Sequence, residues 1–188
     1  MRDSLKKYTE AELVAGCVRG DREAQRQLYE RYSSSMYPVC VRFLGREDAK
    51  DMLQEGFLTV FDKIGSYKGE GSLEGWMRKV FVNASLMQIR KVDVLRRAEE
   101  LDAPQGGGID VMADYGVLEH IGSKEILDLV ADLPAGLRSV FNLFVIEGYT
   151  HAEVGKSLGI TEQSSRSQLS RARAILQEKI KKMYNGKK

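Results

Sequence analysis

The chain has 188 residues, which is enough for one ordinary domain or for two small ones. Hydrophobic residues make up 43% and charged residues 30%, a balance that argues against a disordered chain and favours folded, amphipathic elements in water. No apolar run approaches the roughly 18 to 20 residues that cross a bilayer, so we expect no membrane insertion and a cytoplasmic protein. Cys17 and Cys40 are isolated and histidines occur only at 120 and 151, so we predict neither a disulfide, nor a metal site, nor a cofactor.

Apolar residues recur at helical spacing from Thr9 to about Lys91, without the alternation that is typical of strands. The serines at 33–35 and Pro38 interrupt the first part of this pattern and predict a helical hairpin with a helix start or kink there. The apolar stripe on either side of the interruption consists of Ala24, Leu28, Tyr32, Met36, Val39, Cys40 and Phe43.

The segment 47–64 is predicted to be an amphipathic helix with one acidic face. Leu53, Phe57, Val60, Phe61 and Ile64 share one face, and Asp48, Asp51, Gln54 and Glu55 point towards the other. Such a face is either simply solvated or complementary to a basic partner protein. Catalysis by the paired carboxylates is not expected, because no histidine, nucleophile or glycine-rich phosphate loop accompanies them.

Glycines at 65, 69 and 71 then predict a loop around Tyr67 and Lys68. A second helix follows, with Leu73, Trp76, Met77, Val80, Ala84 and Met87 on its apolar face and an expected end at Arg90 and Lys91. The aromatic ring, the lysines and Asn83 could form a pocket for an unstacked base, because such recognition needs a stacking ring, a base-edge donor or acceptor and cations. A mobile loop beside a solvated helix face is an equally good interpretation. For Trp76 the spacing favours core packing over base stacking.

The stretch after this helix is predicted to be a flexible acidic linker, because it contains Pro104 and three consecutive glycines at 106–108 and has no sustained period. Nine acids stand against one lysine between Glu99 and Asp132, whereas nine cations stand against three acids from Thr150 onward. We therefore expect an all-α fold of two helical domains, at 9–95 and 123–185, joined by a linker at 96–122.

The C-terminal segment has the spacing of a helix-turn-helix. Leu137, Val140, Phe141, Phe144 and Val145 form an apolar stripe that Gly148 closes. Thr150 and Glu153 form a capping box, and Gly159 ends the helix that this box begins. Gly155 is small where a second helix is expected to cross closely. Thr161 caps the next helix, which Leu169, Ala172 and Leu176 hold against the others.

The outward side chains of that last helix are serines, glutamines and arginines, which suit the major groove of DNA. They are Gln163, Ser164, Arg166, Ser167, Gln168, Ser170, Arg171 and Arg173. An ordinary helical hairpin with a solvated basic face is the alternative interpretation. His151, in a first helical turn, is predicted to be solvated or to contact a phosphate, and not to act as a catalyst.

These elements, in this order, resemble the extracytoplasmic-function (ECF) sigma factors of bacterial RNA polymerase from about Thr9 to Met183. Residues 48–64 resemble the family's polymerase-clamp-binding helix with the sequence DAKDMLQEGFLTVFDKI. Residues 66–91 resemble its promoter-melting segment with SYKGEGSLEGWMRKVFVNASLMQIRK. Residues 133–176 resemble its promoter-reading helix-turn-helix with LPAGLRSVFNLFVIEGYTHAEVGKSLGITEQSSRSQLSRARAIL. Many members carry a glycine-threonine-valine-like triplet at 163–165, so Ser165 is polar where the family is often apolar.

The resemblance implies a sigma factor that directs core polymerase to promoters and helps to melt them, with no enzymatic activity of its own. It implies polymerase binding by Asp48, Asp51, Gln54, Glu55 and Phe57. It implies contacts to the minus-ten region by Tyr67, Lys68, Lys79 and Asn83, with a flipped base between Tyr67 and Asn83. It implies contacts to the minus-thirty-five region by Thr161, Arg166, Ser167, Gln168, Ser170, Arg171 and Arg173.

The implied partners are RNA polymerase core, promoter DNA and an anti-sigma factor, and no small-molecule substrate is expected. Two other hypotheses are a free-standing repressor or activator that binds duplex DNA by itself, and a metal-dependent nuclease. The first would leave the acidic helix and the loop at Tyr67 without a role. Activity that depends on a divalent ion, without polymerase, would support the second.

Overall fold

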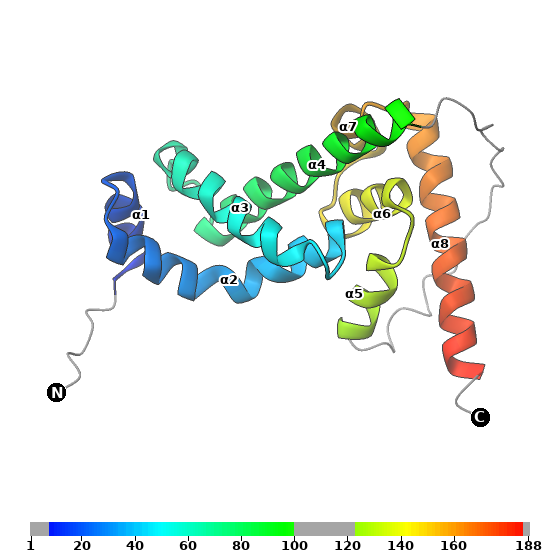
Figure 1. The fold of residues 1–188 in the computed structure, drawn as a ribbon, viewed down its shortest axis with the longest axis horizontal. Helices are drawn as coiled ribbons and strands as arrows, with labels where there is room; N and C mark the ends of the chain where they lie inside the picture. The colour runs from blue at the N-terminus through cyan, green and yellow to red at the C-terminus, as the bar shows by residue number, and fades with distance from the viewer. Residues whose placement is uncertain (1–7, 100–122, 186–188) are drawn as a thin grey trace. The chain divides into compact units, whose positions relative to one another are not determined.

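The computed structural model describes residues 8–99 and 123–185, and every regular element in these two ranges is a helix (Figure 1). This confirms the predicted all-α fold. The elements are α1 (Glu10–Val18), α2 (Arg22–Leu44), α3 (Ala49–Lys63), the short 3-10 helix η1 (Ile64–Ser66), α4 (Leu73–Glu99), α5 (Ser123–Ala131), α6 (Ala135–Phe141), the π-helix η3 (Asn142–Ile146), α7 (His151–Leu158) and α8 (Glu162–Asn185). Most of the predicted linker, 100–122, lies outside the described residues.

Two units make up the chain, and each has its own core. The first unit consists of Met1–Cys40 and Glu47–Ser85, and the second of Val41–Arg46 and Leu86–Lys188. In the described part no helix is both long and apolar enough to span a membrane.

Helix α2 is continuous, so the predicted helical hairpin is wrong. It runs through the serines at 33–35 and through Pro38, which lies inside the helix. Proline removes one backbone hydrogen bond and crowds the preceding turn. The cost is offset by burial, because the apolar stripe stays on one face across the interruption: Ala24, Leu28, Tyr32, Met36, Val39, Cys40 and Phe43 are all at most 6% exposed.

The core of the first unit centres on Phe57 of α3. Its ring lies 4.6 Å from the ring of Tyr29 in α2 and 5.3 Å from that of Phe81 in α4, centroid to centroid. Gly56 lets Phe81 approach, because a Cβ at this position would come within 2.0 Å of the Phe81 ring. The three longest helices of this unit therefore meet at one aromatic cluster.

Helix α4 is buried along a face that differs in part from the predicted one. Leu73, Met77 and Val80 are buried as expected, but Met87 is 59% exposed and Trp76 is only partly buried. The helix also continues past its expected end at Lys91 to Glu99. No glycine or proline occurs between these two residues, so the sequence contains no stop signal there.

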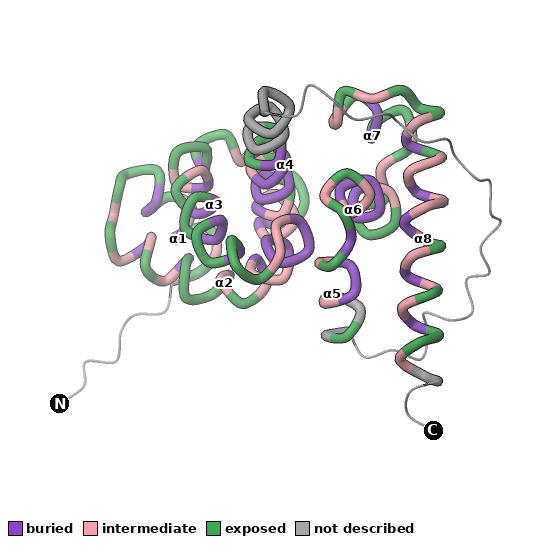
Figure 2. The backbone as a smooth tube through the Cα atoms, turned by 45° about the vertical axis from the view of Figure 1, so that its right-hand side comes forward, coloured by how far each residue is buried: buried purple, intermediate pink, exposed green. Residues whose placement is uncertain are grey.

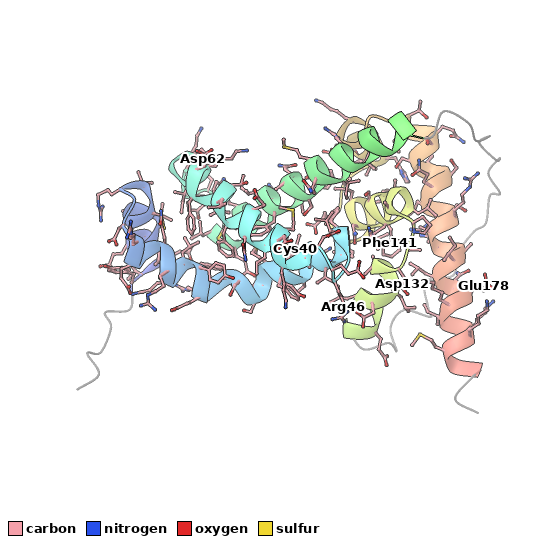
Figure 3. All side chains as sticks on the ribbon, viewed as in Figure 1. Cys40, Arg46, Asp62, Asp132, Phe141 and Glu178 are labelled. Carbon is pink, nitrogen blue, oxygen red and sulfur yellow. The ribbon has the colours of Figure 1, made fainter. Side chains whose placement is uncertain are left out.

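The second unit packs α8 against α6 and α7. Leu169, Ala172, Leu176 and Ile180 recur on one side of α8 and are at most 5% exposed, which gives the regular purple pattern along that helix in Figure 2. Glu178 points away from the side of α8 that faces α6 (Figure 3). Asp132, which follows α5, lies beside α8, where its carboxylate is 3.2 Å from Lys179 Nζ (Figure 3).

Helix α6 passes into the π-helix η3, and this changes which residues are buried. The amide of Glu147 donates to the carbonyl of Asn142 at 2.9 Å, five residues back. The wider turn rotates the apolar side chains that follow it about the helix axis. Leu143 is therefore fully buried, whereas Val145, which was expected in the core, is 40% exposed.

Candidate nucleic-acid interface

The first helix of the predicted helix-turn-helix begins with the expected capping box. Thr150 Oγ1 accepts from the Glu153 amide at 3.3 Å, and the Glu153 carboxylate accepts from the Thr150 amide at 2.8 Å. The hydrogen bond from the Thr150 backbone lowers the pKa of the Glu153 carboxyl below its ordinary value. Two backbone donors that the helix cannot satisfy are thus paired, which fixes the first residue of α7.

The turn between α7 and α8 depends on two glycines. Gly159 has a φ of +70°, in the left-handed region, and ends α7 as predicted. Gly155 lies against the turn and the start of α8, because a Cβ there would lie 2.8 Å from the carbonyl oxygen of Ile160 and 3.5 Å from the amide nitrogen of Glu162. The Ile160 amide donates to the Gly155 carbonyl at 3.0 Å. The turn is therefore held against α7 by backbone contact.

Thr161 caps α8 as predicted, because its Oγ1 accepts from the Ser164 amide at 3.0 Å. This residue is exposed at the start of the helix, next to the side chains that were predicted to contact DNA. Arg166 is 57% exposed and forms an ion pair with Glu162 one turn earlier.

The structure brings the remaining predicted DNA-contacting residues together along α8. Ser167 Oγ lies 3.1 Å from the carbonyl of Gln163, and Gln168 Nε2 donates to Ser164 Oγ at 3.1 Å. The part-buried members of the set are Ser167, Gln168, Ser170, Arg171 and Arg173. Leu169 and Ala172 point into the core and fix the inner face of α8. The polar side chains therefore lie on the flanks and on the outer face of this helix.

His151 has contacts that the sequence did not predict. Its Nδ1 is 2.9 Å from Oγ of Ser165, a fully buried residue of α8. Its ring stacks on Phe144, with the centroids 4.1 Å apart and the planes at 20°. Burial, followed by the nearby charge of Arg166, lowers the pKa of the imidazole below its ordinary value.

In the first unit, helix α3 exposes the predicted acidic face. Asp51, Gln54 and Glu55 are exposed on the helix, and Asp48 is exposed at its N-cap position. Phe57 does not share this face, because its side chain is only 2% exposed within the aromatic cluster. Leu58, which sequence reasoning missed, is 62% exposed. Its spacing of three and four residues from Glu55 and Gln54 was the signal that could have found it.

The predicted loop at Tyr67 is closed by the tyrosine itself. Tyr67 Oη donates to the carbonyl of Gly71 at 2.8 Å, and the ring centroids of Tyr67 and Trp76 lie 5.7 Å apart. Gly69 and Gly71 have φ values of +76° and +78°, which other residues rarely adopt. The aromatic ring is therefore held at the start of α4, with exposed Lys68 beside it in the sequence.

Lys79 and Asn83 are exposed one turn apart on α4. They follow the loop at Tyr67 along the same unit. Among the described residues no group of three or more His, Cys, Asp or Glu side chains could hold a metal ion. The exposed side chains of Lys68, Lys79 and Asn83 are cationic or polar, and the partly buried ring of Tyr67 is aromatic.

Comparison with known proteins gives two family matches, at 28–94 and 123–176. The model described as Sigma-70 region 2 matches residues 28–94, and that of Sigma-70, region 4 matches residues 123–176. The chain is 31% identical over 174 residues to "ECF RNA polymerase sigma factor SigM" of Mycobacterium tuberculosis, covering 89% of this chain and 83% of that protein. It is 25% identical over 180 residues to "ECF RNA polymerase sigma-E factor" of Haemophilus influenzae, covering 92% of this chain and 95% of that protein.

Among solved structures, the chain is similar to the sigma factor RpoE of Bartonella quintana, determined with the anti-sigma factor NepR. The identity is 20% and the TM-score 0.47, over 83% of this chain and 96% of the other. It is also similar to CnrH, determined with the cytosolic domain of CnrY, at 19% identity and a TM-score of 0.44, over 90% and 95% of the two chains.

Proposed function

Because the chain belongs to the ECF family of RNA polymerase sigma factors, and is thus a promoter-specific transcription initiation factor, we propose that three surfaces divide this work. They are the outer side of α8, the Tyr67 loop (residues 66–72) with the exposed side of α4, and the acidic face of α3. Sigma factors are regulatory transcription factors and not classical enzymes. We infer that this chain has no catalytic step of its own and that the polymerase supplies the chemistry.

The observation that carries the proposal is the fixed orientation of α8 in the helix-turn-helix. Its cap at Thr161 and its buried side at Leu169 leave only one side of the helix for DNA. Arginine can bind guanine with two hydrogen bonds, and glutamine can do the same with adenine. On this proposal Arg166, Ser167, Gln168, Ser170 and Arg171 contact the minus-thirty-five element, and Thr161 and Arg173 contact phosphates.

The Tyr67 loop and α4 are proposed to bind the melted minus-ten region. The ring of Tyr67 offers a stacking surface, and Asn83 offers an amide that can pair with a base edge. Lys68 and Lys79 are exposed and would contact the strand's phosphates. A base that has left the duplex stack is the ligand that this combination fits.

The exposed side of α3 is proposed to dock on the polymerase. Asp48, Asp51, Gln54 and Glu55 supply its polar part, and Leu58 adds an exposed apolar side chain one turn along from the acids. Acidic groups steer association with a basic partner surface, and a central apolar contact excludes water from it. Buried Phe57 has a packing role here, holding α3 against its neighbours.

Three further parts of the sequence prediction remain proposals. The domain limits at 9–95 and 123–185, with a linker at 96–122, stay a proposal, and α4 extends into the first residues of that linker as far as Glu99. A cytoplasmic location follows from a role in bacterial transcription. The third proposal is an anti-sigma partner. Co-purification with the tagged chain from its own host tests it, and we expect to recover one protein that is bound in an equimolar amount and inhibits transcription by the chain.

Run-off transcription with bacterial core polymerase tests the proposed function directly. A pool of promoter-like templates is transcribed with and without the chain, and we expect transcripts with defined starts only when it is present. A chain that is folded, binds duplex DNA alone and gives no transcript with core would contradict the proposal and would favour a free-standing regulator.

The docking face is tested by reversing its charge with Asp51→Arg and Glu55→Arg. We expect at least about a tenfold loss of core affinity, because like charges would then meet across the interface. The matched control reverses two other exposed acids, Glu125→Arg and Glu178→Arg, with the same change in net charge. Equal loss of core affinity in both variants would show a general charge effect and would contradict a specific face on α3.

A further inference from the structure

The helix that is proposed to contact the minus-thirty-five element contains a buried polar residue at its first turn. Ser165 is 0% exposed, in line with Leu169 and Ala172 on the inner side of α8. A buried hydroxyl is destabilising unless it is hydrogen-bonded. Its partner is His151 Nδ1 at 2.9 Å, and His151 is the first residue of α7. The hydrogen bond therefore joins the first residue of α7 to the first turn of α8.

The imidazole is itself held in place from its other side. Phe144 of the π-helix η3 stacks on it, with the ring centroids 4.1 Å apart. The capping box at Thr150 fixes the backbone of α7 one residue before His151. The stack on Phe144 and the position of His151 in α7 thus orient the ring, and its Nδ1 is directed at Ser165 of α8.

The apolar contacts of α8 and this hydrogen bond constrain different movements. Leu169, Ala172 and Leu176 keep α8 close to its neighbours, but apolar contacts are non-directional and tolerate small rotations of a helix about its axis. A hydrogen bond to a buried hydroxyl weakens steeply when its angle changes. Ser165 directly precedes Arg166 and Ser167, so a rotation at Ser165 changes the direction of both.

We propose that His151 and Ser165 form a positioning pair that fixes the rotation of α8, and with it the base discrimination at the minus-thirty-five element. This inference rests on the proposed function of α8. Neither residue needs to contact DNA for this role, because the pair acts through the direction of the side chains that follow it. The contact does not depend on one tautomer, since either neutral tautomer of His151 can share one proton between Nδ1 and the hydroxyl.

Two substitutions of one residue separate the hydrogen bond from the ring. In His151→Asn the amide lies at about the position of Nδ1, so it can still bond to Ser165. In His151→Gln the amide lies one bond farther out, near the position of Nε2, and cannot. Both variants lose the stack on Phe144, so they form a matched pair. Ser165→Ala removes the hydroxyl from the opposite side.

The measurement is discrimination by the full chain with core polymerase. The initiation rate on a promoter recovered by run-off transcription is divided by that on the same promoter with its minus-thirty-five element scrambled. We expect Ser165→Ala and His151→Gln to reduce this ratio by about threefold to tenfold, the size of effect of one hydrogen bond. His151→Asn is expected to stay within about twofold of the wild type.

A double variant distinguishes a positioning role from a purely structural one. His151→Phe with Ser165→Ala removes both polar partners and keeps a ring on Phe144, so its melting temperature is expected to return towards that of the wild type. A positioning pair predicts that discrimination stays low although stability is regained. Recovery of both quantities in the double variant would overturn this inference alone. Absence of any promoter-directed transcript with the wild-type chain would overturn the proposed function and this inference together.

Discussion

The two surfaces proposed to bind DNA differ in how firmly their backbones are held. The Tyr67 loop is held at its ends, where the Tyr67 amide donates to the Ile64 carbonyl and Ser72 Oγ accepts from the Gly75 amide. Between these ends it has two glycines at positive φ and the hydrogen bond from Tyr67 Oη to the Gly71 carbonyl. The helix-turn-helix is constrained at almost every step, by the capping box at Thr150, the contact of Gly155 with the turn, and the cap at Thr161.

This difference fits the two proposed ligands. Duplex DNA presents base edges at fixed positions in the major groove. A protein that recognises duplex DNA therefore binds more specifically when its side chains point in fixed directions. An unpaired base has to leave its stack and enter a pocket. A loop that can adjust its conformation can accommodate the base at a lower energetic cost. We therefore expect substitutions in the helix-turn-helix to affect stability and recognition strongly, and substitutions in the loop to affect stability little.

The largest effect on stability is expected from Gly155→Ala. Its Cβ would lie 2.8 Å from the Ile160 carbonyl, a backbone atom that can move only if the turn moves. We expect the free energy of unfolding to fall by about 3 kcal/mol, at the upper end for overpacking. Chemical denaturation measures this loss.

The matched control is Gly136→Ala in α6. Its Cβ would lie 3.4 Å from the amide oxygen of Gln168, the end of a flexible side chain, so little or no loss is expected. A similar loss in both variants would mean that the turn is not the constrained element.

Arg171→Ala is expected to weaken promoter recognition by about 1 to 3 kcal/mol, because a bidentate base contact is lost from α8. Core affinity is expected to stay unchanged, since the proposed docking face lies on α3. Competition between promoter templates measures the first quantity, and titration of labelled core measures the second. A loss of core affinity in this variant would contradict the assignment of α8 to DNA.

Tyr67→Phe tests the loop and is expected to have a small effect on stability, about 0.5 kcal/mol or less. The variant removes the hydroxyl that donates to Gly71 but keeps the ring beside Trp76, and the loop is exposed to water. Thermal denaturation measures the change. A loss comparable to that of Gly155→Ala would show that the loop is as constrained as the helix-turn-helix.

The smallest expected effect is a pH dependence of stability that originates from His151. Its pKa in the folded chain lies below the ordinary 6.5, so the unfolded chain binds this proton more tightly. The stabilising contribution is therefore fully present above about pH 6.5 and is lost as the pH falls below that value. We expect the wild type to lose more stability than His151→Asn between about pH 7.5 and 5.5. Equal losses would contradict this origin.

The features that the sequence predicts well are those whose partners lie within a few residues. The capping box of Thr150 and Glu153, the left-handed Gly159 and the cap at Thr161 all belong to this kind. Each depends on local backbone geometry, which a short motif determines. The buried stripe of α2 was predicted for the same reason, since helical spacing alone defines it.

The features that the sequence could not give depend on distant partners or on unusual helical turns. Pro38 predicts an interruption, but packing along the whole length of α2 keeps the helix intact. Val145 is exposed because the π-helix changes the period that the prediction assumed. In the sequence, Ser165 is a polar residue at a position expected to be apolar. The structure explains it, because His151, fourteen residues away, forms a hydrogen bond with its hydroxyl.

Both cysteines of the chain are buried, and burial raises the pKa of the Cys17 thiol to about 11. The reactive form of a cysteine is the thiolate, so at neutral pH only about one Cys17 in ten thousand would be reactive. Cys40 is fully enclosed in the core. A single cysteine introduced at an exposed position outside the proposed DNA contacts, such as Met87 of α4, would therefore be the preferred site for a maleimide dye. The labelled, folded protein could then report strand separation by fluorescence. Cys17 and Cys40 would not first have to be replaced by other residues.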